Sequence, residues 1–183
     1  YRIGEVLYRR EAFVSHPHQV LALRFTADRP GAVSVRARLD NQLRGQTSLI
    51  RDTLVLEGRC PDVRDVPLGE HIRAEHLHFN DPDCIGYRAA LRAVPEGGTL
   101  RAEDGVLEVS GADALTLYLS ARTSFTRYDQ SPALSDAYQA QALRDLDQAA
   151  ALPYEGLKEA HIKDHQRLFG RVSLRLAGIA PEN

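Results

Sequence analysis

The stretch from residue 8 to residue 28 constrains the fold more than any other part of this chain. From residue 20 on, successive side chains alternate between two sides, which predicts a strand with one buried face. The two sides carry Val20, Ala22 and Arg24, and Leu21, Leu23 and Phe25. Pro17 has no backbone N–H to donate, so strand pairing must break or turn near it. The stretch therefore predicts two strands joined at a proline-marked corner.

Turn residues and alternating segments continue this pattern to about residue 123. Further strands are expected over residues 32–39, 47–50, 53–56, 85–94, 99–102, 106–109 and 114–123. The Asp104-Gly105 pair is a strong signal for a type I′ hairpin turn. Many short strands with tight turns are typical of a β-sandwich.

Residues 59–85 interrupt the pattern and predict a long loop, a kind of segment that is often functional. Its possible metal ligands are His71, His76, His78, Asp81, Asp83 and Cys84. Their spacing matches no ordered zinc module, so we interpret the segment as a polar surface loop and predict no metal site. Cys60 and Cys84 could pair in an oxidising compartment or remain two free thiols; we favour free thiols. The compartment stays open between cytoplasmic and secreted or periplasmic.

The composition excludes several classes of function. Hydrophobic residues make up 43% of the 183 residues, charged residues 26%, and the net charge is −2. This balance lacks the basic face that a nucleic-acid partner requires. No apolar run approaches the roughly 20 residues of a membrane span. No nucleotide-binding glycine motif and no GxSxG nucleophile motif occurs, so we predict no cofactor and assign no catalytic residue.

Near residue 131 the pattern changes from strand to helix. Ser131 or Ser135 can cap a helix that runs to about residue 151, with Pro132 in its first turn. Pro153 can begin a second helix that ends near residue 170. A final strand is expected over residues 172–176, followed by a frayed tail over residues 177–183.

The second predicted helix carries charges within its apolar stripe. At about 100° per residue, one side collects Tyr154, Leu157, His161, Asp164, Leu168, Arg171 and Val172. Buried charges are costly unless they are paired, and His161 and Asp164 are three residues apart and can touch. They could form a catalytic or binding pair, or a buried group that docks the helix onto another domain. We favour docking, which makes His161, Asp164 and Arg171 candidate domain-interface residues.

The ordered motifs along the chain resemble one family. They are Tyr8-x-Arg10-Glu11-x-Phe13-x-Ser15-x-Pro17-x-Gln19-Val20, Arg24-x-Thr26-Ala27-Asp28-x-Pro30-Gly31 and Tyr154-x-x-Leu157-x-x-x-His161-x-x-Asp164-x-x-x-Leu168-Phe169-x-Arg171-Val172. Together they resemble the N-terminal β-domain of family 95 glycoside hydrolases, the α-L-fucosidase family. The resemblance implies a mainly β fold, a galactose-mutarotase-like β-supersandwich seen in part, with two C-terminal linker helices. Residues 1–130 would form the sandwich, truncated at its start, and residues 131–176 the helical linker toward an (α/α)6 catalytic barrel.

The resemblance also implies a function. The parent enzyme would hydrolyse α-L-fucosides or α-L-galactosides in oligosaccharides with inversion, and this chain would be a non-catalytic domain because none of its positions matches a catalytic residue of the family. Its partners would be the barrel of the same parent chain and, through it, an oligosaccharide. A second copy could pair with an open sheet edge near residues 8–28. Two alternatives stay open: the β-domain of a glycoside phosphorylase, and a free-standing carbohydrate-binding sandwich, which the absence of tryptophan and the 7% of aromatic residues weaken.

Overall fold

The computed structural model describes residues 1–79, 84–132 and 136–174. Its main sheet contains seven antiparallel strands, in the spatial order β1 (Arg2–Ile3), β2 (Val6–Ser15), β3 (Val20–Ala27), β12 (Ala114–Thr123), β9 (Gly86–Glu96), β6 (Thr53–Arg59) and β5 (Gly45–Ile50). A second sheet has the order β10 (Thr99–Glu103), β11 (Val106–Ala112) and β4 (Val33–Ala37). Two helices follow, α1 (Ala137–Ala150) and α2 (Tyr154–Phe169). The expected mainly β sandwich with two C-terminal helices is therefore confirmed.

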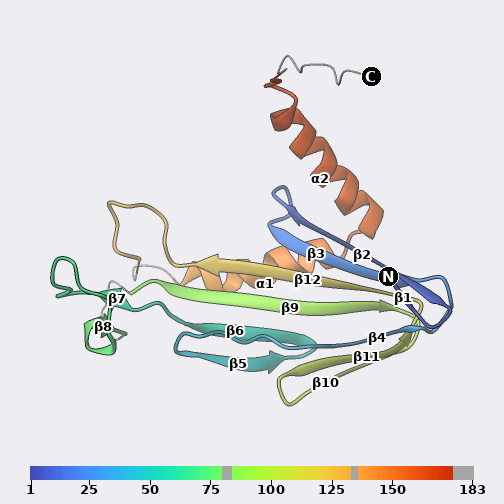
Figure 1. The fold of residues 1–183 in the computed structure, drawn as a ribbon, viewed down its shortest axis with the longest axis horizontal. Coiled ribbons are helices and arrows are strands. Elements are labelled where there is room, and N and C mark those ends of the chain that lie inside the picture. Colours follow the sequence, from blue (N-terminus) through green and yellow to red (C-terminus); the bar gives the residue numbers. More distant parts are fainter. Residues whose placement is uncertain (80–83, 133–135, 175–183) are drawn as a thin grey trace, which may run out of the picture.

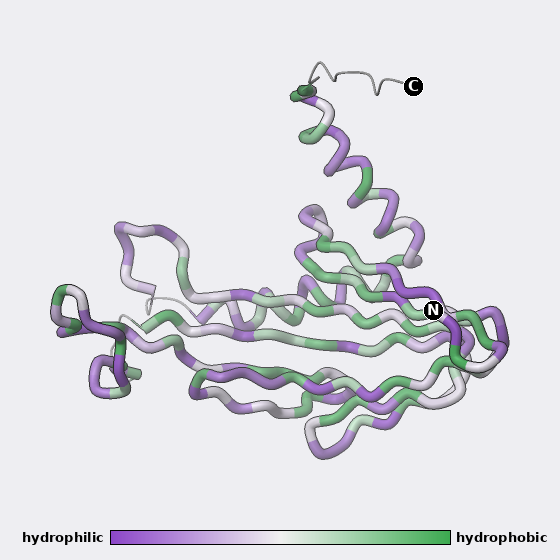
Figure 2. Tube along the Cα trace, in the orientation of Figure 1, coloured by the Kyte–Doolittle hydropathy of each residue, from purple (hydrophilic) through white to green (hydrophobic). Residues whose placement is uncertain are grey.

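The main sheet is the middle of three layers. The second sheet covers one face, where the buried cluster is Val33, Leu54, Leu91, Ala93, Leu107, Val109, Ala112, Leu115 and Leu117. Helix α1 covers the other face, with Val20, Ala22, Val55, Ala90, Tyr118, Leu146, Ala149, Tyr154 and Leu157. Figure 1 shows these layers, and Figure 2 shows hydrophobic positions recurring along the strands between them. A central sheet covered on both faces explains why its middle strands are apolar on both sides.

The proline-marked corner is confirmed. Strands β2 and β3 pair from Tyr8↔Ala27 to Ser15↔Val20, and the four residues between them include Pro17. The prediction of one buried face on β3 was wrong, however. Ala22 is buried in the cluster under α1, whereas Leu23 and Phe25 pack against the cluster under the second sheet. Helix α1 covers one face of β3 and the second sheet covers the other, so side chains on both faces are packed.

The tight turns follow their sequence signals. Asp104 and Gly105 have φ values of 50° and 72°, as a type I′ turn requires at its two central positions. Gly98 also has a positive φ, and a Cβ at this position would lie 2.4 Å from the carbonyl oxygen of Ser110. Only glycine therefore fits the β9–β10 turn without displacing the backbone.

The expected long loop over residues 59–85 contains structure in its described part. Strand β6 extends to Arg59, and two short strands, β7 (Asp62–Val63) and β8 (Leu77–His78), pair antiparallel. A 3-10 turn (Ala74–His76) precedes β8. The backbone N–H of Arg64 donates to the carbonyl oxygen of His76 at 3.1 Å, which extends this small ribbon.

Helix α1 begins later than the sequence signals indicated. It starts at Ala137 after Asp136, so Ser131 is too far upstream to cap it, and Ser135 lies outside the described residues. Its buried positions are Ala142, Asp145, Leu146 and Ala149, a spacing of three to four residues that places them on one side. The helix ends at Ala150, and α2 begins at Tyr154 after Pro153, as expected.

Helix α2 projects away from the sheets instead of lying along them (Figure 1). Only Tyr154 and Leu157, in its first turns, are buried. The predicted continuous buried stripe was therefore wrong beyond this point, since Leu168, Arg171 and Val172 are exposed. The expected final strand is absent from its described part, residues 172–174, where no strand lies alongside to pair with it; residues 175 and 176 and the tail over 177–183 lie outside the described residues.

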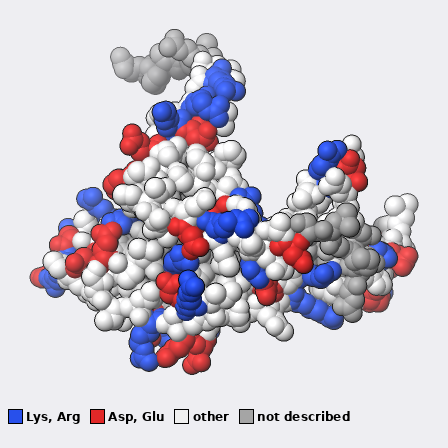
Figure 3. Space-filling model, turned by 180° about the vertical axis from the view of Figure 1, so that it is seen from behind, with Lys and Arg blue, Asp and Glu red and all other residues white. Residues whose placement is uncertain are grey.

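Two further features concern possible partners. Beyond Leu7, the outer side of β2 has no paired strand within the described part of the chain, as the prediction of an open edge requires. Whether a second copy pairs there stays a prediction. No helix among the described residues combines the length and the apolar character needed to cross a membrane. Figure 3 shows acidic and basic side chains interspersed over the face that it presents.

Candidate functional site

The first turns of α2 are anchored on strand β2. Phe13 of β2 contacts two α2 rings, Tyr154 at a centroid distance of 5.9 Å and His161 at 4.8 Å. The Nζ atom of Lys158 donates to Oε1 of Glu11 at 2.6 Å, and the Tyr154 hydroxyl donates to Oε2 of the same carboxylate at 3.4 Å. Apolar, aromatic and ionic contacts thus hold the base of α2 on the sheet edge.

The ionisation of these groups reflects that anchoring. The hydrogen bond from Lys158 lowers the pKa of Glu11 and raises the pKa of Lys158. Burial raises the pKa of Tyr154 to about 12, and the neighbouring Glu11 carboxylate acts in the same direction. All three shifts favour the protonation states found at neutral pH.

The structure places His161 and Asp164 on one side of α2, where they line the same cavity, and Arg171 apart from them. The His161 ring stacks on Phe13, with 21° between the ring planes. The Asp164 carboxylate lies 3.0 Å from Nη2 of Arg167 and 3.7 Å from Nδ1 of His16. Arg171 lies exposed beyond the end of α2. His161 and Asp164 thus each contact other side chains, and their role at a domain interface stays a prediction.

A shallow cavity of about 490 Å³ lies between α2 and the end of β2. We call it the α2 ledge; it is lined by Val14, His16, His161, Asp164, His165, Leu168 and Phe169. Large apolar side chains are uncovered here: Val14 is 65% exposed, Leu168 50% and Phe169 75%. In Figure 2, hydrophobic positions mark the far end of α2. An apolar patch of this kind typically marks a contact surface.

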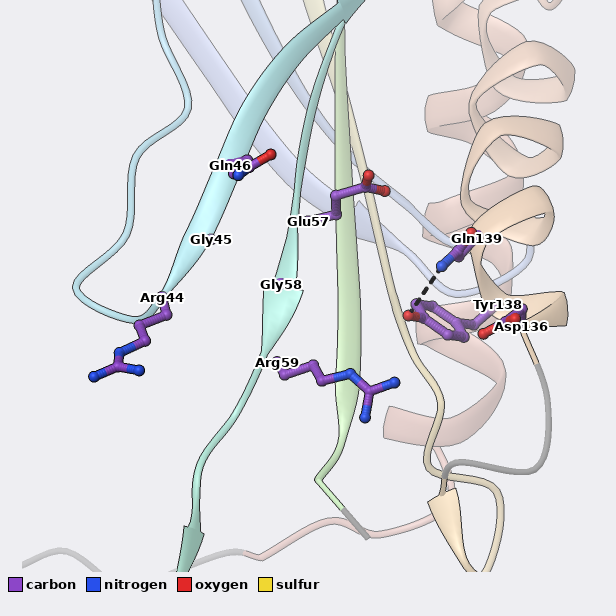
Figure 4. Close-up of a pocket in the computed structure, with 9 residues that line it drawn as sticks. All are labelled: Arg44, Gly45, Gln46, Glu57, Gly58, Arg59, Asp136, Tyr138 and Gln139. Atoms are coloured by element: carbon purple, nitrogen blue, oxygen red, sulfur yellow. Dashed lines mark hydrogen bonds between the residues drawn. The ribbon is translucent and has the colours of Figure 1, made fainter. Parts of the chain in front are cut away.

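A second cavity, of about 590 Å³, lies between the β5–β6 hairpin and the start of α1 (Figure 4). We call it the polar pocket; it is lined by Arg44, Gly45, Gln46, Glu57, Gly58, Arg59, Asp136, Tyr138 and Gln139. In Figure 4, Glu57 and Arg59 extend from β6 toward the first turn of α1, and Tyr138 lies opposite them. Polar groups from two separate elements thus face one space.

One arginine holds the two walls of the polar pocket together. Nε of Arg88, on β9, donates to Oε2 of Glu57 at 2.9 Å, and its Nη2 also bonds this carboxylate. Its Nη1 donates to the carbonyl oxygen of Gln139 at 3.1 Å. Nε2 of Gln139 in turn donates to the Tyr138 hydroxyl at 3.3 Å. The walls are therefore fixed to each other by side chains that are themselves partly buried.

Glycines make room for the tyrosines at this end of the molecule. A Cβ on Gly86 would lie 2.4 Å from the Tyr138 hydroxyl oxygen. A Cβ on Gly45 or on Gly58 would lie 2.5 Å from the Tyr87 hydroxyl, which bonds Nδ2 of Asn41 at 2.5 Å. Larger residues at these glycines would push the tyrosines out and close or distort the polar pocket.

The histidine-bearing segment forms no metal centre among the described residues. His71 and His78 are exposed, and His76 is buried with Nδ1 accepting the backbone N–H of Arg73 at 3.1 Å. No group of three or more possible ligands gathers within the ranges 1–79, 84–132 and 136–174. Asp81 and Asp83 lie outside the described residues.

The two cysteines are free thiols. Cys84 is buried and its thiol donates to the carbonyl oxygen of His78 at 3.0 Å. Burial raises the pKa of the Cys60 thiol, and the nearby Cys84 adds to the effect. A raised pKa makes a thiol less reactive at neutral pH, which favours a structural role for Cys60.

Sequence reasoning found the α2 ledge in part and missed the polar pocket. The ledge residues His161, Asp164 and Leu168 share a helical stripe, which the spacing reveals. The pocket residues come from positions 44–59 and 136–139, and only the fold brings them together. The glycines at 45, 58 and 86 were the one local signal, because glycine within a strand often marks a close approach.

The fold and its comparisons define a class of protein: the N-terminal β-sandwich domain of glycoside hydrolases. The chain is 29% identical over 184 residues to alpha-L-fucosidase 2 of Arabidopsis thaliana, in an alignment that covers 97% of this chain and 22% of that protein. This chain therefore spans about a fifth of the length of that relative. A solved structure described as a putative kojibiose phosphorylase from the human microbiome has the same fold, with a TM-score of 0.53 and 9% identity over 90% of this chain and 21% of that one.

Residues 1–128 match the family described as glycosyl hydrolase family 65, N-terminal domain, and the chain belongs to this family. The resemblance to family 95 is supported at the coarser level of a glycoside hydrolase N-terminal domain.

Proposed function

We propose that this chain is the non-catalytic N-terminal domain of an enzyme that hydrolyses α-L-fucosides, and that α2 docks it onto the catalytic domain. The observation that supports docking is the exposure of the α2 ledge, where Val14, Leu168 and Phe169 are all at least half exposed. Covering these side chains would remove apolar surface from water, which stabilises a contact by about 25 cal/mol per Å². The name of the Arabidopsis relative supports the fucoside as substrate.

The ledge also carries polar groups suited to a specific contact. Asp164 lies between Arg167 and His16, and His165 stacks on Phe169 at a centroid distance of 5.3 Å. An apolar centre with charged and aromatic side chains around it is the usual anatomy of a protein interface. His161, Asp164 and Arg171 would then position the incoming surface, which we propose belongs to a helical barrel of the same polypeptide.

A glycoside phosphorylase is the second candidate, because the solved structure that shares the fold carries that description. The two reactions differ in the acceptor of the glycosyl group, which is water in hydrolysis and phosphate in phosphorolysis. Measuring turnover of an aryl α-L-fucoside without phosphate, and of kojibiose with phosphate, therefore distinguishes them in the full-length polypeptide that contains this domain.

The docking role is tested by Leu168→Asp in that full-length polypeptide. We expect activity to fall at least about ten-fold, because a buried carboxylate would be left unpaired at the interface. The matched control is Gln166→Asp, which introduces the same charge roughly 160° around the same helix. The control should keep full activity.

The same two variants are also compared in the 183-residue chain by thermal unfolding. Both should unfold at the wild-type temperature, since both positions are exposed there. Full activity of the Leu168→Asp enzyme would exclude the docking role. Turnover of an aryl α-L-fucoside by the 183-residue chain alone would contradict a non-catalytic domain.

A further inference from the structure

The geometry of the polar pocket points to a saccharide-binding site on this domain, separate from the α2 ledge. We propose that it holds a small neutral saccharide between β6 and the start of α1. The choice of a saccharide as ligand rests on the proposed function, whereas the existence of a binding site is inferred from the geometry of the pocket alone. Its volume of about 590 Å³ falls within the range of roughly 300 to 1,000 Å³ that is usual for small-molecule sites.

The charges that line the pocket balance. Arg59 and the adjoining Arg88 supply two positive charges, and Glu57 and Asp136 supply two negative ones. The guanidinium group of Arg44 points away from α1 and lies over the Phe79 ring, at 4.4 Å from its centroid. An anion such as phosphate would meet both carboxylates, and a cation would meet both guanidinium groups. A neutral ligand avoids either conflict.

The polar groups of the pocket offer donors and acceptors side by side. The Gln139 amide is already bonded to Arg88 and Tyr138. Gln46 presents an amide that both donates and accepts, Tyr138 presents a hydroxyl, and Asp136 presents a carboxylate that makes no capping hydrogen bond to α1. An apolar ligand would leave these groups without partners, which is costly. The hydroxyl groups of a saccharide both donate and accept, so they match this lining.

The pocket is also built before any ligand arrives. Arg88 fixes Glu57 to the backbone of Gln139, and Gly86 lets the Tyr138 hydroxyl sit against β9. Walls that are held in place lose little conformational freedom on binding, which favours affinity. Figure 4 shows the resulting space between β6 and α1.

The test is a titration of the 183-residue chain followed by backbone amide NMR shifts. Methyl α-L-fucoside and kojibiose are the saccharide probes, and inorganic phosphate is the counter-probe. We expect saturable binding of at least one saccharide, with shifts confined to β5, β6 and the first turn of α1. Gln46→Ala and Asp136→Ala should each weaken that binding about five-fold, the effect of losing one hydrogen bond.

Gln148→Ala is the matched control, because Gln148 is exposed on α1 outside the pocket. It should bind as the wild type does. Absence of binding by both saccharides, unchanged affinity in both pocket variants, or tighter binding of phosphate than of either saccharide would overturn the proposal. Because the titration involves no catalytic domain, its failure leaves the test of fucoside hydrolysis unaffected, and failure of hydrolysis leaves the titration interpretable.

Discussion

Helices α1 and α2 have similar lengths and follow each other in the sequence, yet one side of α1 is buried along its length, whereas α2 is buried only in its first turns. Helix α1 lies along the main sheet and buries Ala142, Leu146 and Ala149. Helix α2 touches the sheet edge only through its first turns and carries an uncovered apolar end. Helix α1 therefore completes the core of this domain, whereas the far end of α2 leaves large apolar side chains uncovered.

Ion pairs show the same contrast. Asp145 of α1 is buried, with Oδ2 2.7 Å from Nε of Arg122 on β12 and Oδ1 2.7 Å from Nε2 of Gln141. Asp164 of α2 pairs with Arg167 on its own helix and, more distantly, with an exposed His16. The pair on α1 ties a helix to a sheet, while the pair on α2 mostly stays within the helix.

The largest expected effect comes from truncating one leucine on each helix. Leu146→Ala should lower the free energy of unfolding by about 3 kcal/mol, because a fully buried side chain is replaced by a cavity. Leu168→Ala should change it by less than about 0.5 kcal/mol, because Leu168 is half exposed in this chain. Urea unfolding of the 183-residue chain measures both values. Equal effects of the two substitutions would show that α2 is packed as tightly as α1.

A smaller difference is expected from the two aspartates. Asp145→Asn should lower the free energy of unfolding by about 2 kcal/mol, because Arg122 loses its charged partner next to the core. Asp164→Asn should cost less than about 0.5 kcal/mol, as is usual for a solvated pair within one helix. A double mutant of Asp145 and Arg122 measures the coupling, and a coupling near zero would mean that the pair does not tie α1 to the sheet.

The sequence predicted the strands well because their signals are local. The corner at Pro17, the Asp104-Gly105 turn and the starts of most strands depend on residues close together in the chain. Burial of both faces of β3 could not be predicted in the same way. It depends on α1 and on strands β10 and β11 of the second sheet, which lie far from β3 in sequence.

The two candidate sites differ in the same way: one has a local signal in the sequence and the other is created only by the fold. The α2 ledge was found in part because His161, Asp164 and Leu168 repeat along one helix. Its exposure was missed, since helical spacing shows which residues share a side but not whether anything covers that side. The polar pocket has no periodic signal, because its walls come from two elements about 80 residues apart.

The smallest expected effect is a weakening, at low pH, of the contacts that hold the first turns of α2 on strand β2. The pKa of Glu11 is lowered by its hydrogen bond from Lys158, so the folded state favours the carboxylate. This stabilisation is fully present above the ordinary value of 4.5 and is lost as pH falls below it through the lowered folded-state pKa. Between neutral pH and about pH 3, we expect the protection of α2 amides against hydrogen exchange, corrected for the intrinsic exchange rate, to fall more than that of α1 amides. Glu11→Gln should remove most of this difference by lowering α2 protection already at neutral pH. Equal losses in α1 and α2 would show that acid loosens the whole domain instead, and that the Glu11–Lys158 contact does not set the docking of α2 on β2.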